Sequence, residues 1–403
     1  YQKKYDENMM VDWYSTSRIG WLCALDWVWN DLTPEERTEL ATTFLDRLDD
    51  GLHKKLIRVN RSGYGTGYYG ENNLQWFTGL VLLNEGIDDA RALEHLKVGY
   101  REYQKLRAHR AAAVGDDGGA ASPTLTYSFH AYPWCEFNFL YTWESATGEN
   151  LAPKWPHTAS MSNYVLWSLL PGNLEFGYGD VEHKTNRFPA SELYPHMSNT
   201  MHLYAESHPD LAALAAYVRE QLGGDYNAVN FPIHAFLQTN LPNCPPPLDP
   251  GRLPPARHFD TMGQVLMRSG SGPDDTYCLF ACGGILGQHR HFDATHFTIY
   301  HRGFLALDTG TRTGNTDNLQ NYYAQTVAHN CIQIKMPGEP PIPYWNGTVF
   351  GNDGGQYKAL GSKVIAFETG PEFTYVAGDA TATYRPEKCS QMVRQLLFIP
   401  PYH

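Results

Sequence analysis

His289, His291 and Asp308 stand in GQHRHFDATHFTIYHRGFLALDTG in an arrangement that suits metal binding or proton transfer. The stretch reads as two strands joined by a turn, with His289 and His291 at the start of the first and Asp308 at the end of the second. Residues i and i+2 of a strand share a face, so both histidines are expected to reach one space. His329 stands directly before another predicted strand, NCIQIK. Imidazole and carboxylate ligands suit Zn²⁺, but a catalytic site and two solvated histidines remain open alternatives.

Two further stretches carry polar residues next to predicted helices. In SGYGTGYYGENNLQWF, Asn72 and Asn73 stand just before an apolar helical pattern. An asparagine there can simply cap the helix, and the glycines lack the spacing of a dinucleotide fingerprint. In SPTLTYSFHAYPW, Tyr127, His130 and Tyr132 stand close together. Their side chains could transfer protons, although such aromatic residues more often pack in a core.

The HxH pattern also fits a cupin, a β family that holds a redox-active metal. GGILGQHRH satisfies the cupin spacing, and Gly303 falls where that motif ends. His296 occupies the position of the cupin glutamate, however, and no second cupin motif follows. A cupin-like metal oxygenase is therefore kept only as an alternative.

The elements that must position these residues fall into two classes along the chain. Residues 1–240 are predicted to be helical. In LTPEERTELATTFLDRLDDGL, Thr33 is the expected N-cap, with Pro34 at the first helical position, Glu36 completing a capping box and Gly51 as the C-cap. Further amphipathic helices are expected in NNLQWFTGLVLLNEG, MSNYVLWSLLPG and HPDLAALAAYVREQLGG.

A proline-rich segment, 241–256, excludes helix and central strand and is predicted to be a linker. Residues 257–403 then alternate in short runs with Gly and Asp turns, such as GQVLMR, TYCLFACG, HFTIYHRG and QLLFIP. This period-two pattern predicts an antiparallel β-sandwich domain. The predicted fold class is α+β multidomain, with helical hairpins followed by the sandwich.

Composition excludes several classes of partner. The 403 residues carry a net charge of −12, which disfavours nucleic acid. No apolar run is long enough for a membrane helix, and the seven cysteines form no metal or disulfide framework. An acidic polysaccharide would need a local basic groove, for which the candidates are Arg58, Arg61, Lys184, Arg187, Arg290 and Arg312.

Residues from about 275 to 400 resemble the β domain of the heparinase II/III-like polysaccharide lyases, most closely heparinase II. The elements that carry the resemblance are GQHRHFD, YHRGFLALDTGTRTG, YYAQTVAHN, NDGGQ, YVAGDATATY and RQLLFIP, in this order. The first domain is similar more weakly, through ENNLQWFTGL, the Tyr127 stretch and GYGDVEH. The resemblance implies an incomplete (α/α) toroid followed by antiparallel β-sandwiches, with family residues missing at both ends.

The resemblance also implies a set of site residues. Tyr127, His289 and Asn72 fall on catalytic positions, and Asn73, Gln75 and Arg312 are expected to bind substrate. His291, Asp308 and His329 fall on the ligands of one structural zinc ion per chain. Asn72 replaces a histidine of heparinase II, and Gln75 replaces a glutamate. Both departures point towards related alginate and heparan lyases and leave the subfamily open.

The implied reaction is β-elimination on a uronic-acid polysaccharide, heparin or heparan sulfate first. Asn72 would stabilise the charge of the uronate carboxylate, while Tyr127 and His289 transfer protons. An alginate or ulvan lyase, a uronyl C5-epimerase, a non-catalytic glycan-binding protein and the cupin oxygenase are the alternatives. We expect a periplasmic or secreted location, no membrane span, and a homodimer as an alternative to a monomer.

Overall fold

The computed structural model describes residues 16–55, 71–115, 118–119, 132–174, 179, 190–222, 245–249, 251, 253–287, 289–311, 318–344, 347–348 and 354–400. The chain divides into two compact units. Unit 1 comprises Tyr1–Arg110 and Tyr132–Leu151, and unit 2 comprises Ala111–Ala131 and Ala152–His403. The predicted linker at 241–256 is not tested by this division, which groups the later helices with the strands. No helix among the described residues is both long enough and apolar enough to cross a membrane.

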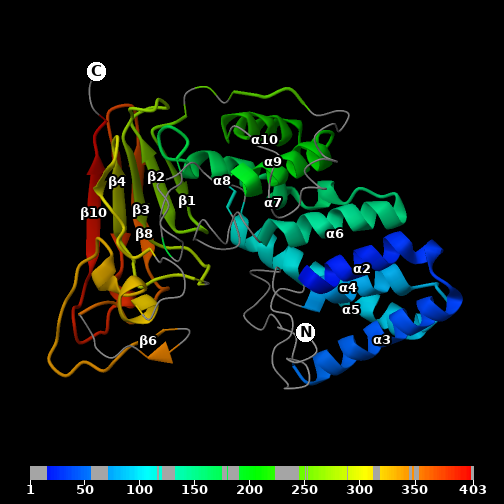
Figure 1. Ribbon diagram of the computed structural model, residues 1–403. Helices are drawn as coiled ribbons and strands as arrows, with labels where there is room; N and C mark the ends of the chain where they lie inside the picture. The colour runs from blue at the N-terminus through cyan, green and yellow to red at the C-terminus, as the bar shows by residue number, and fades with distance from the viewer. Residues whose placement is uncertain are drawn as a thin grey trace. The chain divides into compact units, whose positions relative to one another are not determined.

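The described residues of unit 1 form helices, which Figure 1 shows in colours from blue through cyan to the blue-green of α6. Their bounds are α2 Thr16–Val28, η1 Trp29–Asp31, α3 Pro34–His53, α4 Glu71–Leu82, α5 Asp89–Val114 and α6 Tyr132–Thr147, with α5 passing into unit 2 at its end.

The predicted capping box of α3 is confirmed. Thr33 Oγ1 accepts the backbone N–H of Glu36, and the Glu36 carboxylate accepts the backbone N–H of Thr33. The predicted C-cap is wrong, because the helix runs through Gly51 to His53 and Lys54 is the cap. Gly51 is buried within the last turn, where a small residue fits the packing.

Two glycines bring α4 and α5 into close contact. A Cβ at Gly79 would fall on Leu96, and one at Gly99 would fall on the backbone of Trp76. An aromatic group surrounds this crossing: Trp76 contacts the rings of Tyr103 and Phe139, at centroid distances of 6.2 and 5.0 Å. The crossing therefore holds the amino-terminal half of α4 at a defined place on α5.

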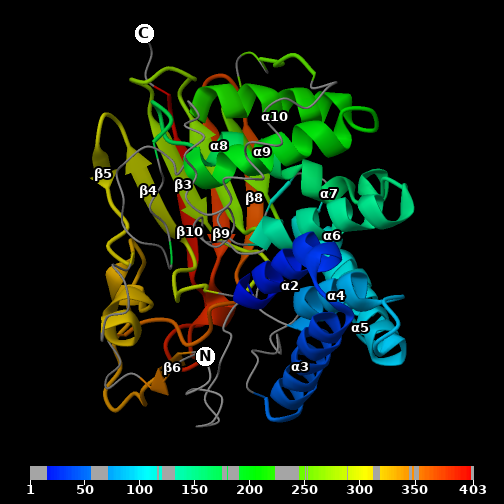
Figure 2. The ribbon, with the colours of Figure 1, turned by 45° about the vertical axis from the view of Figure 1, so that its right-hand side comes forward.

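Unit 2 contains helices and antiparallel sheets (Figures 1 and 2). The helices are η3 Ala152–Lys154, α7 Pro156–Ala159, α8 Met161–Ser168, α9 Ala190–Tyr204 and α10 Pro209–Leu222. The five-stranded sheet has the order β1–β2–β3–β4–β5, with bounds Ala256–Phe259, Gln264–Arg268, Tyr277–Ala281, His296–Tyr300 and Phe304–Ala306. The second sheet has the order β10–β9–β8, with bounds Val393–Phe398, Thr374–Asp379 and Lys363–Thr369, and β6 Pro343–Tyr344 pairs with β7 Gly347–Thr348. Short turns complete the unit: η4 Leu319–Tyr323, η5 Thr326–Ala328 and η6 Thr381–Thr383.

The two larger sheets pack face to face around one apolar core. Val265, Phe280, Val376 and Phe398 are buried there, so both sheets contribute to it. The period-two patterns in the sequence therefore predicted the buried faces. This arrangement is a sandwich rather than a closed barrel, and the cupin alternative is not carried further.

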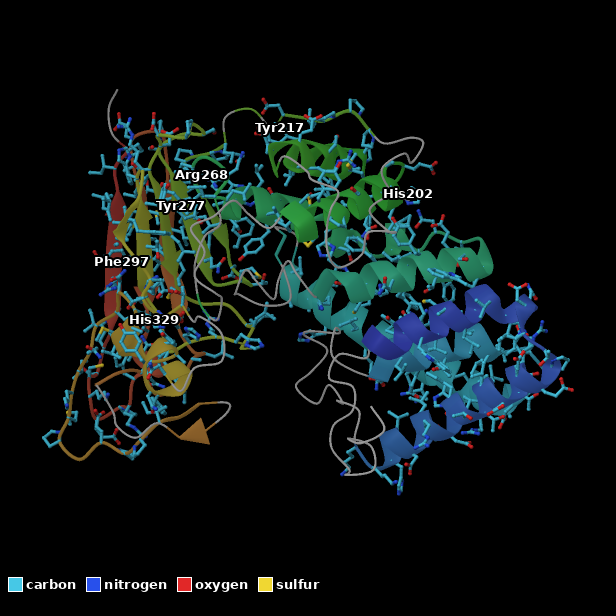
Figure 3. All side chains as sticks on the ribbon, in the orientation of Figure 1. His202, Tyr217, Arg268, Tyr277, Phe297 and His329 are labelled. Atoms are coloured by element: carbon cyan, nitrogen blue, oxygen red, sulfur yellow. The ribbon has the colours of Figure 1, made fainter. Side chains whose placement is uncertain are left out.

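A buried arginine joins α8 to the five-stranded sheet. Arg268, at the end of β2, donates hydrogen bonds to the carbonyl oxygens of Trp167 and Leu169 at the end of α8. These carbonyl groups have no partner within the helix. The guanidinium group also lies 5.2 Å from the ring centroid of Tyr277 on β3, and Figure 3 shows the two side chains together.

Two expectations about the strands near the candidate site are wrong. NCIQIK forms no strand, so His329 precedes an extended segment without a ladder. His289 and His291 do not share a strand face either, because the first strand after them begins at His296. Gly283 and Gly284, both with positive φ, turn the chain after β3, and the segment that follows is a turn rather than a strand.

Candidate functional site

The candidate site in unit 2 is built on a buried pair, Asp308 and His329. Their side chains are fully buried, and His329 Nδ1 lies 2.7 Å from Asp308 Oδ1. The backbone N–H of Gly310 donates to the same carboxylate oxygen, and that of Gly179 donates to Oδ2 at 3.4 Å. Asp308 follows β5 and His329 follows η5, so two separate turns bring them together. Figure 3 shows His329 beside the lower ends of the strands.

Electrostatics couple the two groups. Burial raises the pKa of Asp308, but the neighbouring His329 and His296 outweigh this effect and hold its pKa well below the usual range. Burial lowers the pKa of His329, but Asp308 outweighs it, so the pKa of His329 is raised. The pair therefore consists of a carboxylate and an imidazole ring that donates its Nδ1 proton to it.

This pair fits a metal ion. His329 Nε2 is buried and has no hydrogen-bond partner among the described residues, so in the neutral ring, with the proton on Nδ1, its lone pair can bind a cation. Histidines that bind metal commonly donate their other N–H to a carboxylate. One group of side chains in the described part of the chain brings its ligand atoms within 4.8 Å of one another: His296, Asp308 and His329. An N/O donor set of this kind suits Zn²⁺.

His296, which the sequence analysis did not predict as a ligand, is the third member of this group. Its Nδ1 accepts the backbone N–H of Asn330 at 3.0 Å, and its Nε2 lies 2.9 Å from Thr298 Oγ1. An acceptor role for Nδ1 puts the ring proton on Nε2. Burial lowers the pKa of His296 to about 4, so the ring is neutral. His296 would therefore have to change its tautomer before Nε2 could bind a metal ion.

His291, the predicted third ligand, lies beside His329 but outside the converging group. It is fully buried, and its ring centroid is 5.2 Å from that of His329. Two of the three predicted ligands, Asp308 and His329, thus belong to the group, whereas the third position is shared by His291 and His296 as candidates. The sequence analysis noted His296 only because it occupies the position of the cupin glutamate. Its place at the start of a strand was the signal that could have identified it as a ligand.

Two amides hold the surrounding backbone. The side-chain nitrogen of Asn330 donates to the carbonyl oxygens of Phe297 and Leu307, at 2.9 and 3.0 Å. Gln356 is fully buried and pairs with both backbone groups of Ala294, at 3.0 and 2.9 Å. It thereby replaces a strand partner for the segment between His291 and His296. Sequence reasoning missed both residues, because neither has a reactive group.

Replacing Gly310 by alanine is expected to displace the His329 ring. A Cβ at this position would fall directly on the imidazole, and the ring cannot move without losing Asp308. We expect the Gly310→Ala variant to lose about 1–3 kcal/mol of stability, as overpacked sites do, and to lose metal with it. Thermal unfolding and elemental analysis measure the two effects. Gly370→Ala, where a Cβ meets nothing within 4 Å, is the matched control. A Gly310→Ala variant with the stability and metal content of this control contradicts the close contact between Gly310 and the His329 ring.

His289 lies in a turn with a left-handed backbone. Its φ is 55°, and its side chain is partly exposed. The next residue, Arg290, is buried and donates to the carbonyl oxygens of Gly283 and Leu286, which folds the turn back on itself. Non-glycine residues in this conformation are uncommon and concentrate at functional sites. The partly exposed His289 is therefore in a position compatible with contact to a substrate, while the adjacent Arg290 is buried.

The remaining predicted residues lie in or near unit 1 or outside the described part of the chain. Tyr127 and Arg312 lie outside the described residues. Asn72 and Asn73 belong to the first turn of α4, and nothing is described of their side chains. Gln75, one turn further on, is buried, and its Oε1 lies 3.1 Å from His95 Nδ1. The roles of these five residues stay predictions.

Comparisons with known proteins found a family model and solved structures that match this chain. Residues 251–340 match the family model described as heparinase II/III-like, C-terminal; this segment includes the whole candidate metal group. Comparison with curated protein sequences gave no match.

Solved structures show the fold. A crystal structure of heparinase III aligns with 95% of this chain and 52% of its own, at 17% identity and a TM-score of 0.61. Another heparinase III, with methylated lysines, aligns with 90% of this chain and 46% of its own, at 13% identity and a TM-score of 0.52. The predicted fold class, a helical region followed by antiparallel β-sheets, is confirmed. The chain spans about half the length of these proteins, and a particular closeness to heparinase II stays a prediction.

Proposed function

We propose that this chain is the catalytic part of a polysaccharide lyase that cleaves a uronic-acid glycan by β-elimination. The observation that carries the proposal is the buried Asp308–His329 pair, with the acceptor atom Nε2 of His329, inside the segment that matches the heparinase II/III-like model. Heparin or heparan sulfate is the first choice of substrate, since the two solved structures described above are heparinases. A substrate of this size favours a periplasmic or secreted location.

The reaction requires a base, an acid and a group that stabilises the uronate carboxylate. The base removes the C5 proton, the electron pair forms the C4–C5 double bond, the C4–O4 bond breaks, and the acid protonates O4. Asn72 donates a hydrogen bond to the carboxylate, so that it can accept the charge of the carbanion. Tyr127 acts as base and acid on one face of the ring, and His289 takes the proton from the opposite face.

The metal group supports the turn that carries His289. Asp308 orients His329, and His291 or His296 completes the donor set. Zinc held by these residues would cross-link the segment at 291–296 to Asp308 and to the segment after η5. The role of the surrounding amides is then to hold this backbone in place, and Gln356 does so at Ala294.

Ultraviolet absorbance with a panel of polysaccharides tests the proposal. The full-length protein is incubated with heparin, heparan sulfate, chondroitin and dermatan sulfates, hyaluronan, alginate and ulvan. We expect a rise in absorbance from a 4,5-unsaturated uronate on at least one of them, heparan sulfate first. A flat trace on all of them contradicts the lyase. Deuterium uptake at C5 from D₂O, without cleavage, would then identify a C5-epimerase.

A further inference from the structure

Three helices of unit 1 are joined by polar contacts that run from the half-exposed Asp49 through the buried His95 to the buried Gln75, one turn from Asn72. Gln75 Oε1 on α4 lies 3.1 Å from His95 Nδ1 on α5. His95 Nε2 lies 3.0 Å from Asp49 Oδ1 on α3. Gln75 and His95 are only 5% and 6% exposed, so water does not readily replace the contact between them, whereas the Asp49 carboxylate is 46% exposed.

The charged groups that face His95 come from α3 and from α5 itself. Burial lowers the pKa of His95; Asp49 acts in the opposite direction, Arg91 lowers the pKa further, and Glu94 raises it slightly. The net pKa is below the ordinary value. From α4, the described contact is the uncharged amide of Gln75. Arg91 in turn is held by Asp49, with Nη2 at 2.7 Å from Oδ2.

The proton on His95 decides which end of the Gln75 amide faces it. A neutral ring donates from Nε2 to the Asp49 carboxylate, so Nδ1 is an acceptor and requires the amide NH₂. A protonated ring donates from both nitrogens and requires the amide oxygen, Oε1; the structure holds this arrangement, with Oε1 at Nδ1 and the Asp49 carboxylate at Nε2. Oxygen and nitrogen of an amide exchange by a rotation of 180°, so each state of His95 presents the opposite end of Gln75 away from α5.

We propose that His95 is a positioning residue of the lyase: its protonation state selects the orientation of the Gln75 amide beside the first turn of α4, and so sets the pH range in which substrate binds. This inference rests on the proposed function, in which Asn72 meets the uronate, and on the sequence prediction that Gln75 binds substrate. Gly79 and Gly99 fix α4 against α5, so the amide can rotate while the helix stays in place. The neutral ring leaves Oε1 to accept hydrogen bonds from substrate hydroxyl groups, and the protonated ring turns the amide NH₂ outwards.

The pH dependence of KM tests this coupling. In the wild-type protein, KM rises as pH falls through the pKa of His95, below the ordinary imidazole value of about 6.5, by up to about tenfold per pH unit; kcat changes less. His95→Asn retains an amide near Gln75 but cannot titrate, so this rise disappears. Asp49→Asn removes the carboxylate that raises the pKa of His95, so the rise moves to lower pH.

The matched control is His109→Asn. His109 lies on the same helix, and burial lowers its pKa as well, but no contact joins it to Gln75 among the described residues. The control should keep the wild-type profile. A His95→Asn variant with that profile overturns the proposal, as does a rise that moves to higher pH in Asp49→Asn.

A second measurement does not depend on activity. The side-chain amide signal of Gln75, in ¹⁵N-glutamine-labelled protein and assigned by its loss in Gln75→Glu, is followed by NMR against pH. We expect one titration step at the His95 pKa, absent in His95→Asn. An amide signal without this step overturns the coupling even in an active enzyme. If the Gln75 amide signal shows the titration step but the protein cleaves no uronic-acid polysaccharide, the proposed function is contradicted. The role of His95 is then limited to orienting Gln75.

Discussion

Replacing Asp308 by asparagine is expected to abolish metal binding and to lower the free energy of unfolding by about 3–5 kcal/mol, the usual cost of removing one partner of a buried ion pair. The carboxylate accepts the Nδ1 proton of His329 and two backbone N–H groups. An asparagine offers only one acceptor oxygen and adds two donors. Its NH₂ group therefore faces an existing donor in a site from which water is excluded.

Chemical unfolding and elemental analysis of the purified protein measure the two effects. Asp274→Asn is the matched control, because Asp274 pairs with Arg302 on the surface, with both side chains about two-thirds exposed. Exposed pairs contribute less than about 1 kcal/mol. An Asp308→Asn variant that keeps its metal and unfolds like the control would show that the pair is not part of a metal site.

Replacing Tyr127 by phenylalanine is expected to lower kcat about 100- to 10,000-fold on every substrate, the usual contribution of a positioned acid–base group. The phenol is the proposed acid for O4, and a phenyl ring has no hydroxyl group that could donate or accept this proton. Stability should change little, since the substitution removes one hydroxyl group. Initial rates from unsaturated uronate absorbance, together with thermal unfolding, measure both.

Tyr217→Phe on α10 is the control for this substitution, since Tyr217 is partly exposed and has no proposed role. It should keep the wild-type rate. Residual activity in Tyr127→Phe near the wild-type level would move the role of the acid to His130 or Tyr132, which stand in the same stretch. Loss of activity in both variants would point to folding instead.

The fold class could be predicted from local patterns because those patterns reflect local physics. The capping box at Thr33 and Glu36 depends on residues three apart, and the structure contains it. Alternating residues in β2, β3 and β9 predicted faces that are buried in the sandwich core. The expected strand at NCIQIK failed for the opposite reason. Its apolar residues alternate, but no strand in the described part of the chain pairs with the segment.

The candidate site was predictable only in part. Asp308 and His329 could be named from their residue types and their places after predicted strands, and the structure brings them within 2.7 Å. His289 and His291 were expected on one strand face, but the chain turns there with φ of 55° at His289. Two residues that are neighbours in sequence therefore have different surroundings, one partly exposed and the other buried.

The sequence by itself determined which groups are available: a carboxylate, several imidazole rings, a tyrosine and asparagines at a helix start. Only the tertiary structure decided which of them meet. His296 joins Asp308 and His329, and His95 joins Gln75 and Asp49, across separations of 12 to 46 residues. The physical reason is that periodicity and caps are set by neighbours within a few positions. Contacts across such separations depend on how whole helices and sheets pack.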